Sequence, residues 1–132
     1  MGTRVFTPSA ARRSLEGIRP TAENMSLLYC AMERRRPRVG AGDRPVDPDY
    51  FFMARRLTAA MDRLREAGVR IEDPRSGSIG FPARRAGRMV LLCWRVGEPN
   101  LGYWHEIEGG LVRRHPVDDD GPWEGNDERK RP

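Results

Sequence analysis

Apolar residues recur at helical spacing in the first third of the chain. Thr7 and Pro8 mark a helix start, because the hydroxyl can accept a bond from a free backbone N–H and proline at the first helical position loses none. A short helix is predicted over 9–18, and Pro20 is expected to kink or restart it. The pattern then continues to Pro37 with an apolar stripe formed by Met25, Leu28, Tyr29 and Met32.

A second helix is predicted after a loop over residues 37–46. Asp47 and Pro48 repeat the start signal, and Gly68 lies where a helix should end. Apolar residues spaced four, three, four and three form a heptad seam: Tyr50, Ala54, Leu57, Met61 and Leu64. The two helices, over 8–67, most simply form an antiparallel hairpin. Because the seam exceeds what one short partner helix must cover, we expect a homodimer through the helices.

The period of the pattern changes to two after Gly68, which indicates strands. After a short strand from Val69, further strands are predicted over 78–83, 88–96, 101–107 and 111–116. The predicted fold class is therefore α+β, with the antiparallel helical hairpin packed on a small, mainly antiparallel β-sheet of four or five strands. One domain is expected over residues 1–116, with the β-meander over 69–116. Residues 117–132 are predicted to be a disordered tail in which Trp123 is the one residue able to dock.

Length and composition exclude several protein classes. A chain of 132 residues has room for one domain, and its composition excludes a transmembrane protein, a collagen-like rod, a disulfide-stapled miniprotein and a multidomain enzyme. The formal net charge is +5, and the basic excess lies in residues 1–68, which predicts a basic face. Cys30 and Cys93 lie far apart in apolar surroundings, and no signal-peptide pattern opens the chain. Both features predict a cytoplasmic location.

Acidic and imidazole groups gather in the last third of the sequence. His105 and His115 lie near several glutamates, an arrangement that suits a carboxylate–imidazole metal site or an acid–base pair. The candidate catalytic residues are Glu98, His105 and Glu106. The candidate metal ligands are Glu98, His105 and Glu108.

The turn between the last two predicted strands decides whether the two histidines share a face. A two-residue turn at Gly109 and Gly110 pairs Trp104 with His115. The two imidazoles then point to opposite faces of the sheet, which excludes a shared metal ion. A three-residue loop instead puts both imidazoles on one face. The preference of Gly-Gly for two-residue turns favours the first arrangement.

Each of the remaining candidate residues has a structural interpretation beside the functional one. Arg95 and Arg114 are candidate ligand-binding residues, because a guanidinium fork suits an anion, but solvated strand arginines fit the same pattern. His105 shares a predicted strand face with Tyr103 and Ile107, which is typical of a hydrogen-bonded core histidine. A structural role and a functional role for His105 therefore both stay open.

Several segments together resemble a known family. They are Arg4-Val5-Phe6-Thr7, Asp73 to Pro82, Leu92 to Pro99 and Tyr103-Trp104-His105. These segments resemble the family called bacterial domain of unknown function 2203. The resemblance is best over residues 68–116. The resemblance supports the α+β architecture and implies no reaction, because the family has none assigned. His115 departs from the family pattern, in which a glutamine is common.

Three function classes follow from these observations. The first is a non-catalytic cytoplasmic interaction or ligand-binding module. The second is a small metal- or anion-dependent enzyme that uses the Glu/His cluster. The third is nucleic-acid binding through the basic helices, where Arg34-Arg35-Arg36-Pro37-Arg38 lacks interleaved aromatic residues. No Walker, GxGxxG, CxxC, HExxH or GxSxG motif is present, and the sequence identifies no cofactor.

Overall fold

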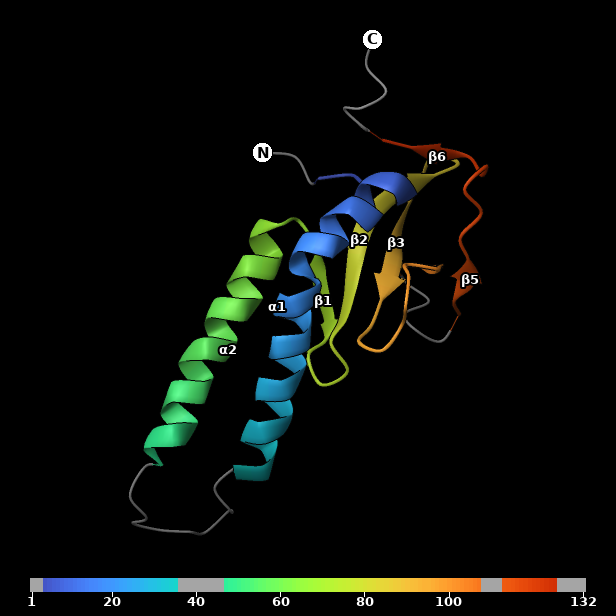
Figure 1. Ribbon diagram of the computed structural model, residues 1–132. Helices are drawn as coiled ribbons and strands as arrows, with labels where there is room; N and C mark the ends of the chain where they lie inside the picture. Colours follow the sequence, from blue (N-terminus) through green and yellow to red (C-terminus); the bar gives the residue numbers. More distant parts are fainter. Residues whose placement is uncertain (1–3, 36–46, 108–112, 126–132) are drawn as a thin grey trace.

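The computed structural model describes residues 4–35, 47–107 and 113–125. Two helices, α1 (Pro8–Arg35) and α2 (Pro48–Glu66), form an antiparallel hairpin whose far end extends beyond the sheet (Figure 1). The strands are β1 (Arg70–Asp73), β2 (Ser78–Arg85), β3 (Arg88–Trp94), β4 (Tyr103–Glu106), β5 (His115–Pro116) and β6 (Trp123–Glu124). The α+β fold is confirmed. The sheet has six strands instead of four or five, since β6 pairs with β2.

Helix α1 runs without a break through Pro20, contrary to the expected kink or restart. Its start is as predicted, because the Thr7 hydroxyl accepts a 3.1 Å hydrogen bond from the backbone N–H of Ala10. Proline removes one backbone donor, which would have bonded the carbonyl of Glu16. Pro20 and Glu16 are both exposed, so water can satisfy that carbonyl and the helix continues.

Helix α2 begins and ends where the sequence predicts. The Asp47 carboxylate accepts a 3.0 Å hydrogen bond from the backbone N–H of Asp49, and Pro48 occupies the first turn. Gly68 follows the end of the helix with a φ of +88°, a conformation that glycine adopts without steric cost. The Arg35 guanidinium lies 3.2 Å from the Asp47 carboxylate and so ties the end of α1 to the start of α2.

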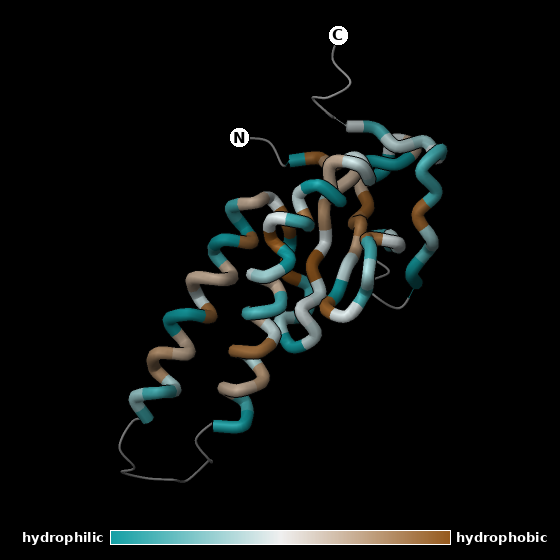
Figure 2. Tube along the Cα trace, in the orientation of Figure 1, coloured by the Kyte–Doolittle hydropathy of each residue, from teal (hydrophilic) through white to brown (hydrophobic). Residues whose placement is uncertain are grey.

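The core lies between α1 and one face of the sheet (Figure 1). Every second residue of β2 and β3 belongs to it, and hydrophobic segments run along these strands in Figure 2. The main contributors from the sheet are Ile79, Phe81, Ala83, Val90, Leu92 and Trp94. Those from α1 are Ala11, Leu15, Ile18, Ala22 and Met25. The sheet therefore buries one face against a helix, as an α+β fold requires.

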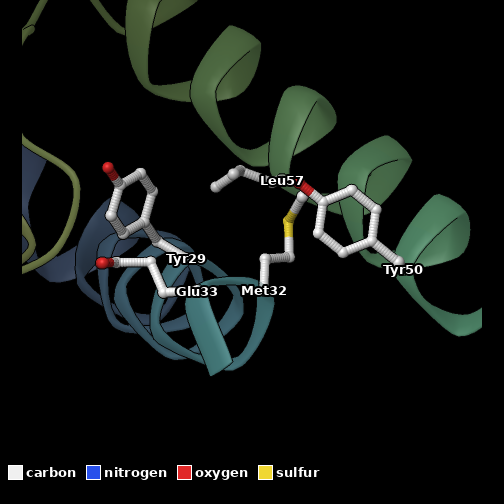
Figure 3. Close-up of a pocket in the computed structure, with 5 residues that line it drawn as sticks. All are labelled: Tyr29, Met32, Glu33, Tyr50 and Leu57. Carbon is white, nitrogen blue, oxygen red and sulfur yellow. The ribbon is translucent and has the colours of Figure 1, made fainter. Parts of the chain in front are cut away.

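The heptad seam of α2 faces α1 within the chain. Leu64 is fully buried, and Leu57 and Met61 are half-buried against the core. Figure 3 shows a small pocket between the helices, in which Leu57 and Tyr50 lie opposite residues of α1. The seam is therefore covered by α1, and any contact between two copies through the helices must use other positions.

The register of the last strands follows the two-residue-turn prediction. Trp104 pairs with His115 and Tyr103 pairs with Pro116 in the antiparallel β4–β5 ladder. The predicted turn itself, at residues 109–110, lies outside the described residues. The His115 ring stacks on Trp104 at 4.4 Å between centroids, so the two histidine rings lie on opposite faces.

The expected tail needs a correction in its first part. Residues 117–125 are held on the sheet, because β6 places Trp123 opposite Arg85 of β2. The indole N–H of Trp123 donates a 2.7 Å hydrogen bond to the carbonyl of Asp118. Trp123 therefore docks as expected, and the domain extends past residue 116. Residues 126–132 lie outside the described part of the chain.

Candidate functional site

Several polar side chains gather on the sheet face opposite α1. Neither of the two described helices covers this face (Figure 1). Because neighbouring strand residues point to opposite faces, Cys93 points away from the core that holds Leu92 and Trp94. We call the following residues the polar cluster: Glu72, Cys93, Glu98, Tyr103, His105 and Arg114. They come from β1, β3, β4 and two connecting segments.

His105 is the most deeply buried member of the polar cluster, with 1% of its surface exposed. Its Nε2 atom lies 2.6 Å from a carboxylate oxygen of Glu72, and its Nδ1 atom lies 2.8 Å from the carbonyl oxygen of Glu106. A carbonyl only accepts, so Nδ1 donates its hydrogen to the carbonyl of Glu106, while Nε2 is hydrogen-bonded to Glu72. Both ring nitrogens are engaged, and neither is left for a substrate, a metal ion or a nucleophile.

The contact between Glu72 and His105 joins β1 to β4 across two intervening strands. In a flat sheet these strands would be about 14 Å apart, so both side chains must reach over the face between them. Gly80 of β2 leaves the room. A Cβ atom at this position would lie 3.3 Å from the carboxyl carbon of Glu72 and 3.2 Å from Leu91. The missing side chain therefore lets the carboxylate cross β2.

We expect Gly80→Val to destabilise the protein by about 2 kcal/mol, because the added methyl groups compete with the Glu72 carboxylate for the same space. Urea unfolding followed by tryptophan fluorescence measures this loss. Gly17→Val is the matched control, since a Cβ at Gly17 meets nothing within 4 Å. Equal stability of the two variants would show that Glu72 does not need the gap at Gly80.

Arg114 binds three other members of the polar cluster. Its guanidinium forms a two-pronged ion pair with Glu98, with N–O distances of 2.8 and 2.9 Å. Its Nε–H donates to the Cys93 sulfur at 3.3 Å, and its guanidinium carbon lies 4.2 Å from the centre of the Tyr103 ring. The side chains of Arg114 and Glu98 are both only 16% exposed. The arginine is therefore held between internal partners.

Glu98 is fixed by the turn that carries it as well as by Arg114. One carboxylate oxygen accepts a 2.9 Å hydrogen bond from the backbone N–H of Arg95. The backbone carbonyl of Glu98 accepts a 2.9 Å hydrogen bond from the indole of Trp94. Partial burial raises the pKa of Glu98, but the bonds from Arg114 and Arg95 outweigh it and hold the pKa below its ordinary value. Glu98 is therefore an ionised structural partner at neutral pH.

Cys93 is buried and is not prepared for nucleophilic chemistry. Burial raises the pKa of the Cys93 thiol above its ordinary value, although the hydrogen bond from Arg114 acts in the opposite direction. Only 1% of the residue is exposed. A protonated, inaccessible thiol suits a packing role.

The polar cluster brings together some of the candidates predicted from sequence and separates others. Glu98, His105 and Arg114 belong to it, but His105 binds Glu72 and not Glu98. The Glu106 carboxylate instead points to the surface, 3.3 Å from Arg88.

The other predicted candidates contribute less. Arg95 is exposed and provides a backbone N–H to Glu98. Glu108 lies outside the described residues. Within the described ranges, no three His, Cys, Asp or Glu side chains are arranged to hold a metal ion.

Sequence reasoning missed the roles of Glu72 and Tyr103. Glu72 carries no local signal for its role, because its partner is 33 residues away and is reached across the sheet. The apolar surroundings of Cys93 in the sequence predict a buried, unreactive thiol, and the structure places it so. The alternation along β4 places Tyr103 and His105 on one face, but it does not show which residues face them.

Two further features limit what the surface can do. Neither helix in the described ranges combines the length and the apolar character that a membrane crossing needs. In the basic segment at the end of α1, Arg35 is paired with Asp47 and Asp49, at 3.2 and 3.3 Å. That charge is therefore partly neutralised within the chain. Arg36 and Arg38 lie outside the described residues.

Comparison with known proteins gives one match. The family described as "Uncharacterized conserved protein (DUF2203)" matches residues 4–117, which include both helices and β1 to β5. No curated protein and no solved structure matches the chain. Since the family covers most of the sequence, including the whole polar cluster, the chain belongs to the DUF2203 family.

Proposed function

We propose that this protein is a non-catalytic interaction module of the cytoplasm. The observation that supports this proposal is the internal pairing of His105 and Arg114, while Oε2 of Glu72, which has no hydrogen-bond partner, is buried out of reach of a substrate. Both nitrogens of His105 bind Glu72 and a backbone carbonyl, and the guanidinium of Arg114 binds Glu98 and Cys93. A catalytic or ligand-binding group needs a free polar atom that a substrate can reach. Here those atoms are used to hold strands and turns together.

The polar cluster has a clear structural role. The sheet face opposite α1 receives neither of the described helices, so its own side chains must cover it. Glu72 and His105 link β1 to β4, and Arg114 links the segment before β5 to β3 and to the turn that carries Glu98. The cluster therefore stabilises a face that would otherwise have no tertiary partner.

The helices carry the largest exposed apolar side chains and are the proposed interaction surface. Leu27 of α1 is 71% exposed, and Phe52 of α2 is 60% exposed. Side chains of this size at the surface of a helix are typical of a contact site for another protein. The expected homodimer through the helices thus stays part of the proposal, on residues other than the heptad seam.

Native mass spectrometry of untagged protein, purified without chelator, tests the absence of a bound cofactor. We expect only the mass of the chain or of whole multiples of it. A stoichiometric extra mass of a metal ion or small molecule would overturn the proposal and leave a ligand-binding module or the small metal- or anion-dependent enzyme. If such a mass were lost in His105→Gln but kept in the surface variant Arg113→Gln, it would be placed at the polar cluster.

A further inference from the structure

Two stripes of exposed residues run along the helices on the side away from the core. The stripe on α1 consists of Glu16, Glu23 and Leu27, and the stripe on α2 consists of Arg63, Arg56 and Phe52. Each stripe lies on one side of its helix, because its residues are spaced by seven and four positions. We call the two stripes together the outer face.

A shallow groove between the helices runs along the outer face. It is lined by Pro20, Thr21 and Asn24 of α1 and by Arg56, Ala59, Ala60 and Arg63 of α2. The small side chains of Ala59 and Thr21 allow another helix to approach closely. Leu27 and Phe52 continue the two stripes toward the far end of the hairpin, which extends beyond the sheet (Figure 1).

The charges of the outer face have no ion-pair partner inside the described part of the chain. The stripe on α1 carries Glu16 and Glu23, whereas the stripe on α2 carries Arg56 and Arg63. Ion pairs between the described residues use other side chains, such as Arg65 with Asp62 on α2. One helix thus presents unpaired acids and the other unpaired bases, which is the complementarity that two copies can satisfy mutually.

The spacing of the two stripes matches when one helix is read in reverse. Along α1, Glu16 is followed seven residues later by Glu23, and Glu23 is followed four residues later by Leu27. Along α2 in the reverse direction, Arg63 is followed after seven residues by Arg56, and Arg56 is followed after four residues by Phe52. An antiparallel pair of these helices therefore aligns three contacts at once: Glu16 with Arg63, Glu23 with Arg56, and Leu27 with Phe52.

We propose that the partner of the outer face is a second copy of this chain, with α1 of each copy packed antiparallel on α2 of the other. This inference rests on the proposed function and names its partner. The two-fold axis runs parallel to the helices, because only then does α1 lie antiparallel to the partner's α2. Symmetry repeats each contact, which gives four ion pairs and two Leu–Phe contacts in a four-helix arrangement.

Sedimentation velocity of the full chain at 1 to about 100 μM tests the dimer and the apolar contact. We expect dimer at the upper concentrations and at least a tenfold weaker association for Phe52→Glu. Phe51→Glu is the matched control, because Phe51 is a similarly exposed neighbour on another side of α2. Equal weakening by both substitutions, or a monomer at every concentration for the unchanged chain, would overturn the inference. Circular dichroism checks that both variants keep their helices.

Charge reversal tests the alignment of the two stripes. Glu23→Arg and Arg56→Glu should each weaken the dimer at least fivefold, and the double variant should return to within about threefold of the unchanged chain. Arg65→Glu is the control, since Arg65 lies on the opposite side of α2 and should leave the dimer unchanged. If the double variant is as weak as the product of the single effects, the alignment is wrong.

The two proposals fail in different measurements. A bound metal ion or small molecule in native mass spectrometry removes the proposed function as a pure interaction module, whatever the oligomeric state. A monomeric chain of clean mass removes the second copy as the partner and leaves the non-catalytic function in place. A dimer that survives Phe52→Glu and both charge reversals shows that two copies associate through a surface other than the outer face.

Discussion

Glu72→Ala is expected to lower the free energy of unfolding by about 3 kcal/mol, because it leaves the Nε2 of His105 buried without a partner. His105 is 1% exposed and the Glu72 side chain is 12% exposed, so the lost hydrogen bond lies in a largely buried setting. In a domain of this size the loss corresponds to a fall in the melting temperature of about 10 °C. Urea unfolding and differential scanning calorimetry measure the two quantities.

Glu106→Ala is the control for this prediction. Glu106 neighbours His105 on the same strand, but its carboxylate is 47% exposed and pairs with the 72% exposed Arg88. A surface ion pair of this kind contributes no more than about 0.5 kcal/mol, so the control should unfold almost like the unchanged protein. If Glu72→Ala and Glu106→Ala lose the same stability, the buried pair does not stabilise the fold.

A combined replacement separates the pair from the space that it fills. Glu72→Leu together with His105→Phe removes the carboxylate and the imidazole at once, so neither is left buried without the other. We expect this double variant to recover much of the stability that Glu72→Ala loses. The recovery would show that the cost of the single substitution comes from the orphaned imidazole.

The elements that sequence predicted correctly depend on local chemistry. Asp47 and Pro48 start α2 because one side chain caps the first turn and the other loses no hydrogen bond there. The register that pairs Trp104 with His115 is the one that a two-residue turn predicts. Both signals lie within a few residues of what they determine, so a single sequence contains them.

The features that sequence missed depend on contacts between distant segments. Pro20 does not break α1, because tertiary packing of the helix on the sheet outweighs a local breaker on its exposed side. Trp123 pairs with a strand 38 positions earlier, and a segment rich in Asp and Gly gives no periodic signal for it. The spacing of the heptad seam predicts an apolar stripe on α2, and the structure has it. The spacing does not indicate which helix covers the stripe.

The candidate site shows the same division. The sequence located His105, Glu98 and Arg114 as the chemically important residues of the last third. It did not show that His105 and Glu98 have separate partners, because Glu72 reaches His105 from β1 across the space left by Gly80. Residues that suggest a reactive site in the sequence therefore form a set of paired polar groups in the folded structure.

Arg114→Gln is expected to cost about 2 kcal/mol at pH 7, because it leaves the half-buried Glu98 carboxylate without its two-pronged partner. Arg113→Gln is the matched control, since Arg113 is exposed and is the preceding residue in the chain. It should unfold within about 0.5 kcal/mol of the unchanged protein. Equal losses in the two variants would contradict a specific role for the Glu98–Arg114 pair.

The pH dependence of that loss identifies Glu98 as its source. The bonds from Arg114 hold the pKa of Glu98 below its ordinary value of 4.5, so the folded carboxylate binds a proton less readily than the unfolded one. A lowered pKa stabilises the fold above the unfolded value and loses this effect as the pH falls through the folded value. Urea unfolding should therefore show a constant gap between the unchanged protein and Arg114→Gln from pH 7 to about 5.5, and a shrinking gap below pH 4. A gap that stays constant down to pH 3 would mean that Arg114 stabilises the fold through Cys93 and Tyr103 instead of Glu98.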